Sequence, residues 1–273
     1  MNQRTPEPAF EHLTLERKDR LVWLRVNRPP LNDLNPAVID ELTRAHRLLA
    51  QDESVGMVVL GGSGEKFFCN GLSPEYVLAQ DADGRAQLFE KLFTLMREMY
   101  AFPKIEAACI GGHAMAGGAV LGILCDFRFM ADSNARFGFS EVAAGLTMPA
   151  FLLDIIAGVT GPQHLVKIAL LATAFRAQEA LAIGLVDAVH APENLEREVE
   201  TYLNNLMDTL PVKSMQHVKQ SIRAKTLSGL EAASSRSLEG LRDFLTGDFD
   251  EGLRAVLERR RPVFASNQKR EHG

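Results

Sequence analysis

Short apolar runs alternate with segments of helical periodicity in the first 192 residues, and this alternation constrains the fold more than any other feature. The predicted strands are residues 21–26, 57–60, 107–110 and 127–130. The predicted helices between them are residues 35–49, 88–100 and 117–124. Strands that alternate with helices in this way favour an α/β core.

The first predicted helix has both a start signal and an apolar face. Asn35 is a favourable cap residue, and Pro36 suits the first helical position because its ring fixes the backbone angle that a helix needs. Apolar residues then follow at spacings of four, three and four, at Val38, Leu42, Ala45 and Leu49. This spacing places them on one side of a helix, which we expect to face the core.

The last third of the chain has no strand pattern and is predicted to be helical. One helix follows Pro211, and the capping-box pattern of Ser228 and Glu231 predicts that another begins there. Gly247 is predicted to end that helix, and Asp248 to begin the last one. The apolar faces of these helices need a partner surface, which is either the core or another subunit.

Length and composition exclude several classes of protein. A chain of 273 residues fits one large domain, which we divide into a core at 1–200 and a helical region at 201–273. A net charge of −5 argues against a nucleic-acid footprint. Three cysteines without a C-x-x-C pair, and histidines without ligand spacing, predict neither disulfides nor a metal site. We expect a soluble, cytoplasmic protein, because the sequence has no signal peptide and no membrane-spanning run.

Two glycine-bearing turns each follow a short predicted strand, at 67–73 and at 111–120. Glycine lets a ligand approach the backbone closely. A helix that begins at the second turn would point its free N–H groups and its dipole at such a ligand. Two backbone donors that converge on one oxygen form an oxyanion hole. On glycine content alone, close-packing turns are the simpler interpretation, and neither turn is a P-loop or a dinucleotide fingerprint.

These turns, together with three later stretches, resemble the crotonase (enoyl-CoA hydratase/isomerase) superfamily. The stretches are residues 68–72, 116–118, 125–132, 137–141 and 177–187, in family order. The resemblance implies a ClpP-like spiral of repeated ββα units with an all-helical C-terminal trimerisation region, in trimers or dimers of trimers. It also implies a substrate that carries coenzyme A or a pantetheinyl thioester, and no separate cofactor.

The resemblance assigns catalytic roles to three residues. The backbone N–H groups of Leu72 and Gly117 would hold the thioester oxygen. Hydratases of the family use two glutamates, and at those positions this chain has Val120 and Glu141. Glu141 is therefore the predicted catalytic acid/base, and Val120 is predicted to line the substrate pocket.

The same resemblance predicts a wider set of substrate-binding residues. Around the first turn these are Cys69, Asn70, Gly71, Ser73 and Tyr76. Near the nucleotide end of coenzyme A they are Arg28, Leu31 and Asn32, with positive charge from Arg259, Arg260, Arg261 and Lys269. Ser73 replaces an aspartate that is common in the family. We interpret Cys69 as a small buried residue and His113, beside the second turn, as structural rather than catalytic.

Residues 138–151 and the tail at 243–258 resemble the mitochondrial-type Δ3,Δ2-enoyl-CoA isomerases, so we predict an isomerase acting on an acyl thioester. Other crotonase reactions stay open, namely decarboxylation or hydration of an enoyl thioester. So does an acyl-carrier protein as the thioester carrier, in fatty acid or polyketide metabolism. The alternative from a different class is a catalytically silent crotonase-fold subunit.

Overall fold

The computed structural model describes residues 9–268, and its centre is a six-stranded sheet. The strands, in spatial order, are β1 (Leu13–Lys18), β2 (Leu21–Val26), β3 (Met57–Gly62), β5 (Ile105–Ile110), β7 (Phe127–Ala131) and β9 (Ala188–His190). Only β1 and β2 form an antiparallel pair, and every later neighbour is parallel. Parallel neighbours need long crossovers, which explains why helices follow the strands.

A second, smaller sheet lies within these crossovers. Its strands are β4 (Phe67–Cys69), β6 (His113–Met115) and β8 (Phe137–Gly138), and both pairings are parallel. Each small strand follows a strand of the large sheet and precedes a helix, so the chain repeats a ββα unit. The predicted spiral of ββα units is therefore confirmed.

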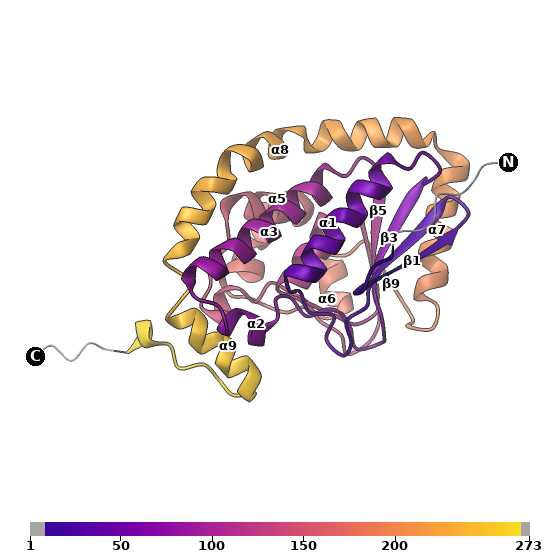
Figure 1. Ribbon diagram of the computed structural model, residues 1–273. Helices are drawn as coiled ribbons and strands as arrows, with labels where there is room; N and C mark the ends of the chain where they lie inside the picture. The colour runs from indigo at the N-terminus through magenta and orange to yellow at the C-terminus, as the bar shows by residue number, and fades with distance from the viewer. Residues whose placement is uncertain (1–8, 269–273) are drawn as a thin grey trace, which may run out of the picture.

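Helices cover both faces of the large sheet (Figure 1). On one side lie α1 (Pro36–Gln51), α3 (Ala82–Ala101), α4 (Gly117–Leu124) and α5 (Ala150–Thr160). On the other side α7 (Leu195–Thr209) buries Leu195, Val199 and Leu203 against the sheet. Successive side chains of β2 point to opposite faces of the sheet, as in any strand. Trp23 accordingly packs against α7, while its neighbour Leu24 packs in the main core. The predicted boundary at residue 200 falls inside α7.

Several predicted elements match the structure, and others differ at their ends. The strand at 21–26 and the helix at 117–124 have the predicted bounds, and the Asn35 side chain caps α1 by accepting a 3.0 Å hydrogen bond from the Val38 N–H. Helix α3 begins at Ala82, six residues before the predicted start. The remaining short elements are α2 (Pro74–Leu78), α6 (Ala177–Ala182), the 3-10 helices Val142–Ala144, Pro162–His164 and Ala265–Asn267, and the π-helix Val166–Leu170.

The C-terminal helices are α8 (Val212–Arg242) and α9 (Asp248–Glu258). Figure 1 shows α8 as a long arch over α3 and α5, with α9 turning back under α2. The predicted helix start at Ser228 is wrong, because α8 continues through it and the Ser228 hydroxyl donates to the Lys225 carbonyl one turn back. Although α8 has 31 residues, no helix within residues 9–268 is long and apolar enough to cross a membrane.

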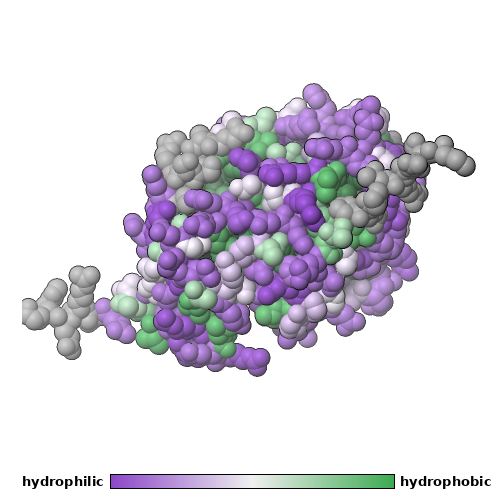
Figure 2. All heavy atoms as spheres, viewed as in Figure 1, coloured by the Kyte–Doolittle hydropathy of each residue, from purple (hydrophilic) through white to green (hydrophobic). Residues whose placement is uncertain are grey.

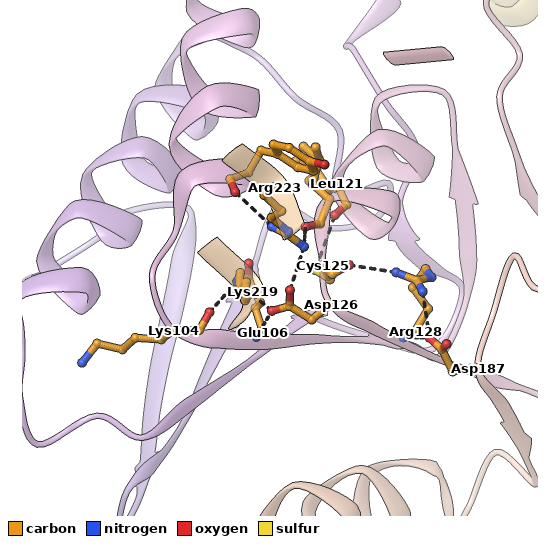
Figure 3. Close-up of polar contacts among 11 residues, drawn as sticks. Lys104, Glu106, Leu121, Cys125, Asp126, Arg128, Asp187, Lys219 and Arg223 are labelled. Atoms are coloured by element: carbon orange, nitrogen blue, oxygen red, sulfur yellow. Dashed lines mark hydrogen bonds and ion pairs between the residues drawn. The ribbon is translucent and has the colours of Figure 1, made fainter. Parts of the chain in front are cut away.

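A buried charge cluster attaches α8 to the core (Figure 3). The Asp126 carboxylate pairs at 2.7 Å with both Lys219 and Arg223 of α8, and it accepts the Glu106 N–H at 2.8 Å. Lys219 also donates to the Lys104 carbonyl. Buried charges persist only when they are paired and hydrogen-bonded. The 125–132 stretch of the family resemblance therefore has a structural role at Asp126.

The trimer or dimer of trimers stays a prediction, and the surface of the C-terminal helices motivates it. Val218 and Ile222 of α8 are 56% and 73% exposed, and hydrophobic residues reach the surface over the C-terminal segment at the lower left of Figure 2. Light scattering at micromolar concentration is expected to give a trimer or hexamer. Truncation after Thr209 is expected to cause aggregation, since it uncovers the surface that Leu230, Leu241 and Leu245 bury. A folded full-length monomer would contradict this prediction.

Candidate active site

The three predicted catalytic residues follow the three strands of the small sheet. Leu72 comes after β4, Gly117 after β6 and Glu141 after β8. Because these strands are parallel and neighbouring, their carboxyl ends meet at one edge of the sheet, which is where α/β folds place ligands. Residues separated by 69 positions in the sequence are thereby brought to one place.

The two glycine-bearing turns are in direct backbone contact. A Cβ added at Gly118 would lie 1.9 Å from the Cys69 carbonyl oxygen, and one at Gly117 would lie 3.3 Å from the Gly71 Cα. Gly71 also has a φ of +83°, which side-chain-bearing residues rarely adopt. These glycines are therefore required for the two turns to meet.

The amide groups of Leu72 and Gly117 are placed to act as donors. The bridge between Leu34 and Leu72 uses the Gly71 carbonyl and the Ser73 N–H, so it leaves the Leu72 N–H unused. Gly117 is the first residue of α4, where an N–H has no partner within the helix. Ala116 just before it has a strained backbone, with φ of 46° and ψ of −120°. Such strain is typical of turns that serve a ligand.

A cavity of about 320 Å³ opens at this edge of the sheet. Leu72, Gly117, Val120 and Glu141 all line it, together with Asn70. The rest of the lining is Pro74, Phe89, Leu92, Phe93, Met96, Met115, Ala116, Ser140, Ala144, Leu146, Thr147, Pro149, Leu152, Leu241, Phe249, Leu253 and Val256. Among the described residues that line this cavity, Glu141 is the only ionisable one.

Glu141 is a carboxylic acid in an apolar cavity. The residue as a whole is partly buried, but its Oε2 is shielded from solvent and no described residue hydrogen-bonds to it. Burial disfavours the charged form and raises the pKa of Glu141 from 4.5 to about 7. A carboxylate with a pKa near neutrality can both accept and return a proton, which suits an acid/base catalyst.

The other predicted substrate-binding residues around the first turn do not line the cavity. Cys69 is fully buried, and burial raises the pKa of its thiol to about 12, so it is an unreactive packing residue. Ser73 is buried too and donates to Glu75. Tyr76 packs against the core beside the cavity. His113 accepts the Arg136 N–H at Nδ1, and its ring lies tilted against Phe67 with centroids 5.4 Å apart, which fits its structural interpretation.

The loop that was predicted to bind coenzyme A lies beside the first turn. The Leu31 carbonyl accepts the Asn70 N–H at 3.2 Å, while the Asn32 amide is fully buried and donates to the carbonyls of Ser63 and Phe67. Arg28 pairs with Asp33. The binding role of this loop stays a prediction. In the tail, Arg260 pairs with Glu251 and Glu258, and Lys269 lies outside the described residues.

The walls of the cavity include residues that the sequence did not identify as site residues. Helix α3 contributes Phe89, Leu92, Phe93 and Met96. The tail contributes Leu241 of α8 and Phe249, Leu253 and Val256 of α9. The apolar face of the tail was the available signal, but the sequence left open whether it packs on its own core or on another subunit. In the structure, α9 closes the cavity of its own chain.

Among the side chains that the structure describes, at residues 9–230 and 239–268, no group of three or more His, Cys, Asp or Glu has an arrangement that could hold a metal ion. In the described lining of the cavity, the groups suited to chemistry are the backbone donors and Glu141. Together they define a class of α/β protein that can hold an oxyanion beside a single buried acid/base group.

Comparison with known proteins identifies the family. A model of the family described as Enoyl-CoA hydratase/isomerase matches residues 16–267. A crotonyl-CoA hydratase from Syntrophomonas wolfei subsp. wolfei is 32% identical over 267 residues, which cover 94% of this chain and 99% of the relative. The chain belongs to the enoyl-CoA hydratase/isomerase family, the crotonase superfamily of enzymes.

Solved structures of both reaction types share the fold. The human mitochondrial Δ3,Δ2-enoyl-CoA isomerase aligns with a TM-score of 0.86 at 23% identity, covering 91% of this chain and 98% of that one. An enoyl-CoA hydratase from Mycobacterium avium subsp. paratuberculosis aligns with a TM-score of 0.82 at 28% identity, covering 94% and 100%. The choice of reaction therefore depends on the residues in the cavity.

Proposed function

We propose that this enzyme moves a double bond from C3=C4 to C2=C3 in an acyl-CoA thioester. The observation that supports this most strongly is the content of the cavity. Glu141 is its only ionisable residue among the described lining, and Val120, 3% exposed, provides hydrocarbon at the first turn of α4.

The chemistry of the two reactions explains why one carboxylate favours isomerisation. Hydration requires one group to orient and deprotonate a water and a second group to protonate C2. Isomerisation needs no water, because one base can remove a proton from C2 and return it at C4. The intermediate dienolate carries its charge on the thioester oxygen, where the N–H groups of Leu72 and Gly117 would stabilise it. An apolar neighbour such as Val120 keeps competing water away.

Hydration is the second candidate, since the Syntrophomonas wolfei relative is a crotonyl-CoA hydratase. Hydration needs a second acid/base group, and the remaining polar side chains of the described lining are the neutral ones of Asn70, Ser140 and Thr147. Amides and hydroxyls of ordinary pKa are weak proton carriers at neutral pH, so this reaction is expected to be the slower one.

The two reactions are separated by offering one enzyme both substrates. With 3-hexenoyl-CoA, the conjugated 2-enoyl product is expected to accumulate. With 2-hexenoyl-CoA, the 3-hydroxy product is expected at a rate at least ~100-fold lower, the usual contribution of one acid/base group. Hydration as fast as isomerisation would make the enzyme a hydratase. If neither reaction occurs while hexanoyl-CoA still binds, both assignments are wrong, and decarboxylation of an acyl thioester or a silent subunit becomes the next hypothesis to test.

A further inference from the structure

Helix α9 forms one wall of the cavity and also touches the turn that carries Glu141. A Cβ added at Gly252 would lie 2.2 Å from the Ala144 carbonyl oxygen, and one at Gly145 would lie 2.5 Å from the backbone of Asp248. Helix and turn are therefore in backbone contact on both sides. A displacement of α9 away from the core would therefore remove one wall of the cavity and the contacts with the Glu141 turn together.

A single buried arginine connects this helix to the rest of the site. Arg85 of α3 is 5% exposed, and its Nε donates to the carbonyls of Val77 and Gln80, just beyond the first turn. Its Nη1 donates to the carbonyl of Leu245, between α8 and α9, and lies 2.7 Å from Asp250 Oδ1 of α9. The last contact lacks hydrogen-bond geometry and is an ion pair.

The contacts of Arg85 join three segments beside the cavity that are distant in the sequence: the end of α2, the link between α8 and α9, and α9 itself. A buried guanidinium is stable only when its donors are satisfied, so loss of either side is unfavourable. Asp250 has a second function, since its Oδ2 accepts the Gly247 N–H at the start of α9. Phe249 next to it packs on Phe89 of α3 with ring centroids 6.4 Å apart. The polar contacts between Arg85 and Asp250 therefore lie next to the apolar contact that Phe249 makes with α3.

We propose that Arg85 is a positioning residue that fixes α9 against the Glu141 turn, so that the acyl pocket is closed and its acid/base group is kept from water. This inference deepens the proposed function and rests on it for the kinetic consequence alone. Arg85 touches no part of the cavity lining with its charge, because its guanidinium is engaged by backbone carbonyls and Asp250.

The test compares Arg85→Met with a matched buried arginine. Arg128 is 4% exposed, donates to the carbonyls of Leu185 and Cys125, and pairs with Asp187 away from the cavity (Figure 3). Arg85→Met is expected to speed amide exchange of residues 248–258 at least ~10-fold, the effect of losing a charge-assisted hydrogen bond. Arg128→Met is expected to lower the melting temperature without this local effect. Asp250→Asn, which keeps the backbone bonds, is expected to shift exchange in the same direction by less.

The kinetic readout is the pH dependence of isomerisation. Once water reaches Glu141, its pKa is expected to fall, so the midpoint of kcat/KM against pH moves at least ~1 unit lower in Arg85→Met. No other ionisable group of the described cavity lining, from α3, α4, α8, α9 or the Glu141 turn, contributes to this midpoint. Arg85→Lys is expected to restore part of the shift.

The outcomes separate this inference from the proposed function. If amide exchange of residues 248–258 is unchanged in Arg85→Met, Arg85 does not fix α9, whatever the activity of the variant. An unchanged pH midpoint with faster exchange would overturn its effect on Glu141. A wild type without isomerase turnover would refute the proposed function, while the exchange comparison would still decide whether Arg85 holds α9.

Discussion

Replacement of Glu141 by glutamine is expected to abolish isomerase turnover while acyl-CoA binding is retained. Glutamine keeps the shape of the side chain and removes the proton acceptor. Loss of one acid/base group typically costs ~10²–10⁴-fold, and the upper end applies here because the same group would serve both proton transfers. The measurement is kcat with 3-hexenoyl-CoA beside the dissociation constant for hexanoyl-CoA.

The wild type is expected to show the corresponding pH dependence. Its kcat/KM should rise with pH through a midpoint of about 7 and level off at higher pH, because the free enzyme must carry Glu141 as the carboxylate to take the proton from C2. A midpoint near the ordinary value of 4.5 would mean that water reaches the carboxylate. Turnover by Glu141→Gln near the wild-type rate would mean that another group is the base.

The same substitution is expected to increase stability. Between pH 4.5 and about 7 the folded protein binds more protons at Glu141 than the unfolded chain, so the free energy of unfolding falls as pH rises through that window. Glutamine does not ionise and avoids this loss. The expected gain at pH 8 is at most about 3–4 kcal/mol, from a shift between 4.5 and about 7 at about 1.4 kcal/mol per pKa unit, and it disappears below pH 4.5. Urea denaturation at both pH values measures it, and an equal gain at both would exclude ionisation as its cause.

Activity and stability therefore change in opposite directions at Glu141. A carboxylate that is useful near neutral pH needs a raised pKa, and here desolvation in the cavity raises it. That desolvation is unfavourable for the folded state once the group ionises. The closed wall formed by Phe249, Leu253 and Leu241 increases both effects.

The sequence predicted β2, β3, β5 and β7 of the large sheet, because their apolar runs are continuous. It missed β1, in which buried and exposed residues alternate, and the three-residue β9. The small sheet was implied by the family resemblance alone and by no local sequence pattern, since β4, β6 and β8 are only two or three residues long and such strands have no readable period. This sheet nevertheless places the three residues that the resemblance identified. Leu72, Gly117 and Glu141 lie in local turn motifs, which explains why they were recognisable before the sheet was.

The tail shows where sequence reasoning reached its limit. Its helices and their apolar faces were predicted, but which surface they cover depends on contacts far apart in the chain. Arg85 and Asp250 are 165 positions apart, and neither has a signal in its local sequence. Ser228 shows the opposite error, in which a local capping pattern is overridden because helix α8 continues from Val212 to Arg242.

Replacement of Val120 by glutamate tests the assignment of the reaction through the gain of hydratase activity instead of the loss of isomerase activity. Val120 lines the cavity from the first turn of α4, and the resemblance places the second hydratase glutamate at this position. The variant would supply a second carboxylate beside Glu141. We expect it to form more 3-hydroxyacyl-CoA from 2-hexenoyl-CoA than the wild type, and to isomerise 3-hexenoyl-CoA more slowly.

The gain in hydration is expected to be limited by the cavity itself. Val120 is 3% exposed, and burying an ionised carboxylate without a partner costs several kcal/mol. The new group is therefore expected to be partly protonated at neutral pH and to lower the melting temperature. Val120→Gln is the matched control, since it has the same size and polarity without a carboxylate. It is expected to impair isomerisation without gaining hydration.

Efficient hydration by the wild type would contradict the role of Val120 outright, because another group would then supply the second acid/base function. His113 and Tyr76 lie outside the cavity lining, so Asn70, Ser140 and Thr147 would be the residues to replace next. Equal hydration by Val120→Glu and Val120→Gln would show that polarity, and not the carboxylate, admits the water. A rise in hydration with Val120→Glu alone would support the interpretation that a single hydrocarbon side chain keeps this active site an isomerase.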